Sequence, residues 1–424
     1  MYPAAAILML VFQVLGFGRT LPWSVLPLGL GHFFWMVISV GFLVWLKKPG
    51  IIKSDTILNL AARRFSLMGF ALFILPFLAF DVFRFSHFGY GFPTAHLIIL
   101  SVIVPFLRRD RLWVSFLLSL LLLVASIIHF PLHPDRSDML PVIQTGLDFW
   151  GAGKSSYSIF QMGDRTNFMS YLPGTMFFHL PAWWMGMDLR WNTVFLRLCW
   201  MLLILFVLKR RHFWAERNGV MTALHFFALS PYLNFRHDLY FEGFFLLLVL
   251  FMVVPKRRWL WLPLMIWTRQ WSWVLTPFFL GAQILQKRRI DGQTALKCIA
   301  GLLGVIACFL VLLKQSTFSE FMHATFWFQD VITKPEYSGD YGLTLAPVFY
   351  AVHISTVLQK LQGIIALILF FLALRELKKK QRTDWLRWAG CCWVWFLMLN
   401  PHFWLYFWLS PALYFTLLPF TEKG

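Results

Sequence analysis

Long apolar runs recur along almost the whole chain, and they constrain its fold more than any other feature. The run at 112–130, LWVSFLLSLLLLVASIIHF, carries no Asp, Glu, Lys or Arg. An apolar run of about 18 or more residues can cross a bilayer as a helix, whereas membrane strands would alternate apolar and polar residues. Only 13% of the 424 residues are charged, against roughly a quarter in soluble domains. The sequence therefore predicts an all-α, multi-pass membrane protein with about 11–14 spans.

Basic residues gather in short clusters between the apolar runs, and these clusters predict the topology. They lie at 47–64, 108–111, 209–217, 256–258, 287–289 and 375–382. Cytoplasmic loops carry an excess of Lys and Arg, so we place every cluster in the cytoplasm. Spans are then expected near 4–18, 22–46, 65–84, 93–107, 111–132, 190–208, 218–235, 239–254, 294–314, 361–377, 385–399 and 403–420. The net charge of +19 forms no continuous basic face, so nucleic acid is not an expected partner.

Two apolar segments do not fit this series of simple spans. Residues 259–286 lie between two cytoplasmic clusters, so they are expected to enter the membrane and return as two short helices broken near 268–270. A non-helical backbone at that depth needs a covering of protein or a water-filled cavity. Residues 172–188 are expected to form a short helix at the outer face, because a crossing there would reverse the sidedness of 209–217.

With this topology, the polar residues outside the basic clusters gather on the non-cytoplasmic side. They lie in the segments 133–171, 234–242, 268–270, 315–345 and 400–402. Ionisable groups at membrane depth are costly and usually mark function. We therefore expect a site that faces away from the cytoplasm.

Asp135 and Asp138 are the first candidates for chemistry, because they follow the apolar run at 112–130 directly. A carboxylate at a membrane edge can act as a general base. The alternative is structural, since Asp138 is also well placed to cap a following helix.

Arg269 is the most costly charge in the chain, because it lies inside the apolar stretch MIWTRQWSWV. Its planar fork of donors suits a phosphate. The alternative is an ion pair with a carboxylate on another span, such as Asp238 or Glu242. Arg236 and His402 are expected on the same side of the membrane as Arg269.

No cofactor is predicted from the sequence. The stretch GAGKSS at 151–156 lacks the upstream glycine of a phosphate-binding loop, because position 148 is Asp. His129 and His133 lie four residues apart and could contribute to a metal cluster, but structural histidines are the favoured interpretation. A divalent metal is left open.

The order of these motifs resembles that of membrane glycosyltransferases of the GT-C class, and within it the α-mannosyltransferase-like group that uses polyprenol-phosphate-mannose. Asp138 is followed by Gly151, by Tyr157 and by YLP at 171–173. The stretches SPYLNFRHDLYFEGFFLLLVL, LMIWTRQWSWVLTPFFL and LNPHFWLYFWLSPAL resemble later segments of that family. The resemblance covers residues 133 to about 415. A Gly-Gln pair often found in the family near Phe241-Glu242 is absent here.

The resemblance implies an inverting transfer of a sugar, with a mannose-like hexose as the first guess. The donor would be a polyprenyl-phosphate-linked sugar, and the acceptor a hydroxyl of a glycan or glycolipid. Asp138, with Asp135 second, would be the catalytic base, and Arg269, Arg236 and His402 would hold the donor phosphate. Substrate contacts are expected from Tyr157, Tyr171, Gln270 and His237. A bacterial inner membrane is favoured over the endoplasmic reticulum.

Residues 111–424 would form the catalytic region, with external loops at 133–189 and 315–345. Residues 1–110 would be an N-terminal set of membrane helices and could form an added module, because the family's catalytic loop often follows the first span. Two other functions stay open on the sequence. One is a transporter or flippase for a charged lipid or anion, and the other is a lipid-linked polysaccharide ligase or polymerase.

Overall fold

The computed structural model describes residues 112–129, 132, 139–162, 165–210, 218–228, 241–287, 292–313, 316–327, 355–379, 384–398 and 409–421. This part of the chain is mostly helical, as predicted. The α-helices are α6 (Leu112–His129), α7 (Met139–Gly151), α8 (Pro173–Trp184), α9 (Arg190–Arg210), α10 (Asn218–Ala228), α12 (Glu242–Val253), α13 (Arg258–Thr268), α14 (Leu275–Lys287), α15 (Gly292–Leu313), α16 (Phe318–Met322), α20 (Ser355–Lys379), α21 (Asp384–Met398) and α22 (Leu409–Leu417).

Several shorter elements interrupt or extend these helices. They are the 3-10 helices η4 (Pro255–Arg257), η5 (Gln270–Val274) and η8 (Leu418–Phe420), the π-helix η6 (His323–Trp327), and the strands β1 (Phe160–Met162) and β2 (Arg165–Asn167). The two strands pair antiparallel, with Gln161 opposite Thr166. This hairpin was not predicted from the sequence, because strands of three residues are too short to show an alternating pattern.

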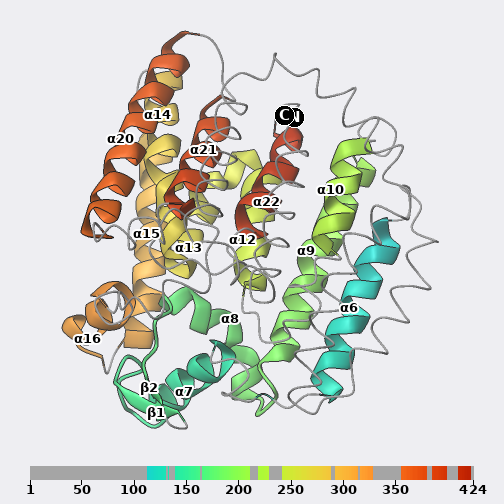
Figure 1. Cartoon of the computed structure of the whole chain (residues 1–424), viewed down its shortest axis with the longest axis vertical. Helices are drawn as coiled ribbons and strands as arrows, with labels where there is room; N and C mark the ends of the chain where they lie inside the picture. The colour runs from blue at the N-terminus through green and yellow to red at the C-terminus, as the bar shows by residue number, and fades with distance from the viewer. Residues whose placement is uncertain are drawn as a thin grey trace, which may run out of the picture.

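The helices are arranged as a bundle with a smaller cap at one end (Figure 1). The cap contains α7, the β1–β2 hairpin, α8 and α16, and helices such as α6, α9 and α15 extend away from it. α9 leaves the cap at Arg190 and runs along the bundle, with Lys209 and Arg210 in its last turn. The cap is built from the two segments that were expected to be external loops.

Large aromatic side chains form the centre of the bundle. The Trp200 ring is fully buried and meets Phe116, Phe227 and Phe245 edge to face, with ring centroids 5.9, 5.8 and 6.4 Å away. Such pairs add about 0.5–1.5 kcal/mol beyond the area they bury. These contacts join α6, α9, α10 and α12 into one packed unit.

Among the described residues, one helix is long and apolar enough to cross a membrane. It is α9, with 21 residues and a mean hydropathy of 2.0, and it is about 31 Å long at 1.5 Å per residue. Shorter apolar helices cover Leu112–Ala125, Glu242–Val253, Gly363–Arg375 and Leu409–Phe420. A core helix of a soluble protein can have the same length and composition as α9, so α9 alone does not define a multi-pass fold.

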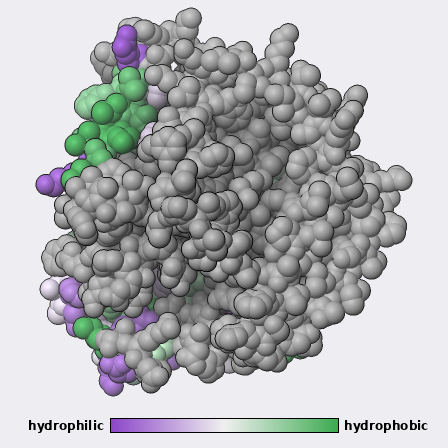
Figure 2. Space-filling model, in the orientation of Figure 1, coloured by the Kyte–Doolittle hydropathy of each residue, from purple (hydrophilic) through white to green (hydrophobic). Residues whose placement is uncertain are grey.

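Several helices turn large apolar side chains outward. On α9 these are Trp191, Phe195, Leu198, Leu202 and Phe206, which recur at helical spacing along one face. On α6 they are Trp113, Leu117, Leu121 and Ile128, and on α20 they are Val357, Ile364, Leu367, Ile368 and Phe371. Figure 2 shows a hydrophobic patch over α20, with hydrophilic atoms gathered at the cap end. Soluble monomers rarely expose contiguous apolar patches of this kind.

The helices α6, α9, α10, α12, α15, α20, α21 and α22 lie in eight of the expected spans. The spans expected at 4–18, 22–46, 65–84 and 93–107 fall outside the described residues. The segment 172–188 forms the short helix α8, as predicted. At 12 residues it is about 18 Å long, well short of a bilayer core of about 30 Å.

Candidate functional site

The predicted break in the segment 259–286 is present, and it falls at Arg269. α13 ends at Thr268, Arg269 is extended (φ −146°, ψ 127°), and η5 starts at Gln270. The Arg269 carbonyl accepts hydrogen bonds from the backbone N–H and the hydroxyl of Ser272, at 3.2 and 2.7 Å. Pro277, near the start of α14, needs no partner for a backbone N–H there and so suits a new helix start. The helix is therefore interrupted at a charged residue that lies within an apolar stretch of the sequence.

The Arg269 guanidinium is buried against an aromatic ring. Its side chain is 3% exposed, and its Cζ atom lies 3.7 Å from the centroid of the Phe241 ring. Phe241 is fully buried directly before α12. A desolvated cation over a ring gains about 2 kcal/mol. α12 and the break together hold a fixed positive charge inside the protein.

Glu242 was one of two carboxylates proposed to pair with Arg269, but it forms an ion pair with Arg197 of α9. The Arg197 Nε and Nη2 atoms donate to Glu242 Oε1 at 3.0 and 2.7 Å. Trp200 Nε1 donates to Glu242 Oε2 at 2.6 Å, and Arg197 Nη1 donates to Ser119 of α6 at 3.3 Å. Arg197 was not among the predicted residues, although an arginine in the interior of the apolar run 190–208 was the signal that could have found it.

Gln270 connects the break to both segments of the cap. Its Nε2 donates to the Ser170 carbonyl at 3.3 Å and to the Thr325 carbonyl at 3.4 Å. Ser170 belongs to the segment between β2 and α8, and Thr325 to η6. Three segments that were expected on one face of the membrane therefore meet at Gln270.

The Thr325 carbonyl lies within the π-helix η6, which continues α16. π-helical turns are rare and often occur at functional sites. α16 begins with a capping box, in which Thr317 and Glu320 satisfy each other's backbone N–H groups. These hydrogen bonds from Thr317 lower the pKa of the Glu320 carboxyl. The irregular turn at η6 thus follows a well-formed helix start and faces the broken helix at Gln270.

α8 approaches the break closely enough to bond to its backbone. The Thr175 hydroxyl donates to the Thr268 carbonyl at 2.9 Å. A Cβ at Gly174 would lie 2.7 Å from the Trp267 carbonyl oxygen, a contact that only glycine avoids. The last carbonyls of α13, which have no partner within their helix, are met in part by α8.

Tyr157 and Tyr171, both predicted substrate contacts, are bonded to each other. The Tyr157 hydroxyl donates to the Tyr171 carbonyl at 3.1 Å. The Tyr157 ring is buried edge to face against Phe321 of α16, at 5.2 Å, and burial raises the pKa of its hydroxyl well above the usual value. The structure places Tyr157 at the seam between the cap segments, while Tyr171 is half-buried one residue after Ser170.

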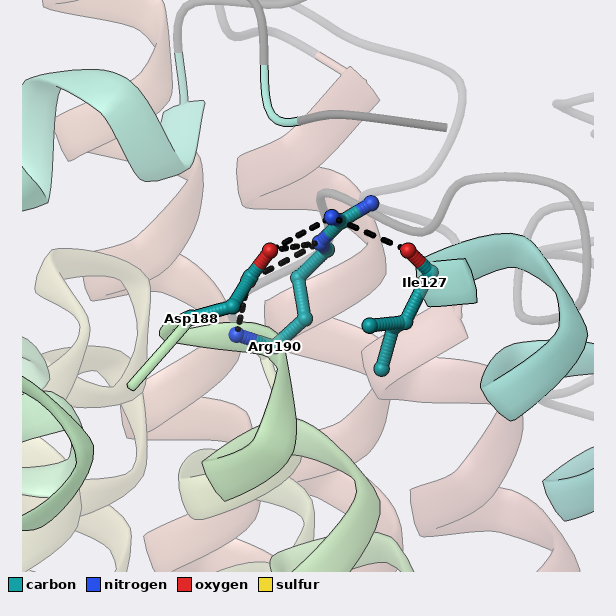
Figure 3. A network of polar contacts seen from close by, with 3 residues as sticks. All are labelled: Ile127, Asp188 and Arg190. Carbon is teal, nitrogen blue, oxygen red and sulfur yellow. Dashed lines mark hydrogen bonds and ion pairs between the residues drawn. The ribbon is translucent and has the colours of Figure 1, made fainter. Parts of the chain in front are cut away.

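The buried Arg190 joins the segment between α8 and α9 to α6. Arg190 is 1% exposed and donates through Nε and Nη2 to the Asp188 carboxylate (Figure 3). Its Nη2 also reaches the Ile127 carbonyl of α6 at 3.5 Å. The cap segment that carries α8 is therefore held at a defined position against two bundle helices.

The predicted residues Asp135, Asp138, Arg236, His237 and His402 lie outside the described residues, as do His133 and Asp238. α7 starts at Met139, directly after Asp138. Within the described part of the chain, no group of three or more His, Cys, Asp or Glu side chains could hold a metal ion.

Comparison of the chain with family models, with curated proteins and with solved structures finds no match. The function is therefore argued from the chemistry of the site.

Proposed function

We propose that this protein is a multi-pass membrane glycosyltransferase that takes a sugar from a polyprenyl-phosphate donor, as the GT-C resemblance implies. The acceptor is a hydroxyl of a lipid-linked glycan or glycolipid, and a mannose-like hexose is the first candidate for the sugar. The reaction takes place on the non-cytoplasmic face, and a bacterial inner membrane is the favoured location.

The observation that carries this proposal is Arg269, a buried cation at a helix break where the cap meets the bundle. A broken helix with an ionisable group at its break is a costly arrangement that usually accompanies a ligand. Arginine binds phosphate through two parallel N–H bonds. A phosphate linked to a lipid is the anion that suits such a position.

The outward apolar faces of α6, α9 and α20 support a membrane location. α9 matches the thickness of a bilayer core and ends in Lys209 and Arg210, as expected for a helix that ends in the cytoplasm. The polar cap would then lie on the opposite side, beside Arg269.

In the proposed reaction, the acceptor oxygen attacks the anomeric carbon as the bond from that carbon to the phosphate oxygen breaks. The acceptor proton passes to the carboxylate of Asp138, or to Asp135. The polyprenyl phosphate leaves with the bonding electrons, and Arg269 stabilises its charge, with Arg236 and His402 as further donors. Fixed positive charge at the leaving group is usually a large catalytic contribution.

The test is transfer by the purified protein in lipid nanodiscs, with a panel of polyprenyl-phosphate sugars and mass spectrometry of the lipid products. Asp138→Asn should lower the rate by about 10²–10⁴, and Arg269→Gln by about 10²–10³. Lys256→Gln, an exposed residue of η4, is the matched control and should transfer at the wild-type rate. Near-wild-type transfer by Asp138→Asn would sink the proposal.

Transport of a charged lipid or anion is the competing function, because transporters also use broken helices and buried charge. The nanodisc assay separates the two functions. A transporter would bind a polyprenyl phosphate or move it between leaflets, and it would form no new glycosidic bond.

A further inference from the structure

We propose that Phe241 is the positioning residue that orients Arg269 for a phosphate, and that the buried Arg197–Glu242 pair holds Phe241 in place. This inference rests on the proposed role of Arg269 and adds residues that the sequence analysis did not assign.

The Phe241 ring covers one face of the Arg269 guanidinium. The Arg269 Cζ atom lies 3.7 Å from the Phe241 ring centroid, and both side chains are buried. Arginine has many rotamers and loses about 1.5–2 kcal/mol of conformational entropy when it is ordered. A ring against one face of the guanidinium restricts those rotamers before any ligand arrives.

The N–H donors of Arg269 point away from the Phe241 ring. The N–H bonds of a guanidinium lie in its plane, whereas the ring contacts its face. Stacking on Phe241 and hydrogen bonding to a phosphate therefore use different parts of Arg269 and do not compete. The ring sets the plane in which a bidentate phosphate contact has to lie.

The hydrogen bonds of the neighbouring residue Glu242 fix the position of Phe241. Phe241 directly precedes Glu242, the first residue of α12. The Glu242 carboxylate is held by Arg197 and Trp200 of α9, and Arg197 also bonds Ser119 of α6. Side chains of two other helices, α9 and α6, thus fix the start of α12, and the Phe241 carbonyl accepts the Phe245 N–H at 2.9 Å.

Phe251 provides a matched control for Phe241. It is also fully buried, on α12, and its ring packs against Phe279 and Trp385, away from the start of the helix. Phe251→Leu and Phe241→Leu remove rings of the same size from the core, so loss of packing should affect both variants alike.

The first measurement follows Arg269 without any ligand. Protein labelled with ¹⁵N-arginine is prepared in nanodiscs, and Arg269→Lys identifies the Arg269 Nε–H signal by NMR. The ring current of Phe241 should shift this signal upfield. Phe241→Leu should abolish the shift, while Phe241→Trp and Phe251→Leu should retain it. An unchanged signal in Phe241→Leu overturns the inference.

The second measurement is binding of undecaprenyl phosphate by calorimetry. Phe241→Leu should weaken binding about tenfold, Phe241→Trp should restore it, and Phe251→Leu should stay within about twofold of wild type. Wild-type affinity in Phe241→Leu, with the upfield shift lost, also overturns the inference. If the wild type binds no phosphate lipid, the proposed role of Arg269 fails, and the Phe241 stack stands or falls on the Nε–H signal alone.

Discussion

Arg197 and Arg269 are both buried in the bundle, and they are accommodated in different ways. Arg197 faces a carboxylate, and its Nε, Nη1 and Nη2 atoms each donate a hydrogen bond. The guanidinium of Arg269 lies against the face of the Phe241 ring at a helix break. A cation stacked on a ring at such a break suits an anionic ligand.

Substitution of the buried Tyr157 tests whether its hydroxyl contacts the substrate. Tyr157→Phe removes the hydrogen bond to the Tyr171 carbonyl and keeps the ring against Phe321. The free energy of unfolding should fall by about 1 kcal/mol, measured by denaturant unfolding in detergent, with transfer close to wild type. A large loss of transfer at unchanged stability would instead show that the hydroxyl meets the substrate.

His179 of α8 should make stability depend on pH. It is fully buried, burial lowers its pKa from 6.5 to about 4, and the nearby Leu189 backbone opposes this only in part. As the pH falls below 6.5, His179 becomes protonated in the unfolded chain. In the folded protein it stays neutral until the pH falls to about 4. Stability present above pH 6.5 should therefore be lost as the pH falls to 4, by roughly 3 kcal/mol.

Thermal unfolding of the wild type and of His179→Leu, measured from pH 7.5 to pH 4, checks this expectation. Glu320 also loses its favourable hydrogen bonds when protonated, but it is present in both proteins. The slope of stability against pH should be shallower in His179→Leu, and identical slopes would rule out His179 as the cause.

At the scale of elements, the site is built from two irregular turns and one close helix approach. The break between α13 and η5 and the π-helix η6 meet at Gln270, and α8 seals the end of α13 through Thr175. Regular helices satisfy their own backbone groups, so exposed carbonyls occur where helices end or change type. Here the carbonyls of Thr268, Ser170 and Thr325 accept hydrogen bonds from side chains of other segments, namely Thr175 and Gln270.

Gly174→Ala should damage this junction. The added methyl would lie 2.7 Å from the Trp267 carbonyl oxygen, so α8 has to move away from α13. We expect a loss of about 1–3 kcal/mol in unfolding free energy and a fall in transfer, because Arg269 lies two residues beyond Trp267. Gly363→Ala is the control, since a Cβ there meets nothing within 4 Å in exposed α20, and it should stabilise by about 0.5–1 kcal/mol. Equal effects of the two substitutions would contradict the close approach of α8.

At the scale of the whole molecule, the two ends of α9 differ in chemistry. α9 begins beside the cap, which carries the polar contacts around Gln270, and it has Lys209 and Arg210 in its last turn. Positive charge is retained on the cytoplasmic side of a membrane. If α9 crosses the membrane as proposed, the cap is expected to lie outside.

Cysteine labelling measures that orientation. In a cysteine-free background, Lys154→Cys in the cap and Lys256→Cys in η4 both introduce exposed thiols. A membrane-impermeant maleimide should label position 154 in intact cells, and position 256 only after permeabilisation. Labelling of both positions, or of position 256 alone, in intact cells would contradict the topology.

The sequence by itself determined the helical class, most helix positions and the place of the break. These features depend on local properties, namely apolar run length and the cost of placing Thr-Arg-Gln inside an apolar stretch, and such properties can be read one segment at a time. The sequence also led to the expectation that the cap segments share one face of the membrane, because topology sorts loops by side before any packing is known. Their meeting at Gln270 is a tertiary contact.

Only the tertiary structure decided which groups meet. Glu242 was a predicted ion-pair partner of Arg269. The packing of α9 against α12 instead brings Arg197 to the Glu242 carboxylate, and Phe241 lies against Arg269. Tyr157 was expected to contact substrate, and its hydroxyl bonds a backbone carbonyl in the seam of the cap. Partners that are far apart in sequence depend on helix rotation and side-chain direction, and these are set by the whole core rather than by the residues on either side.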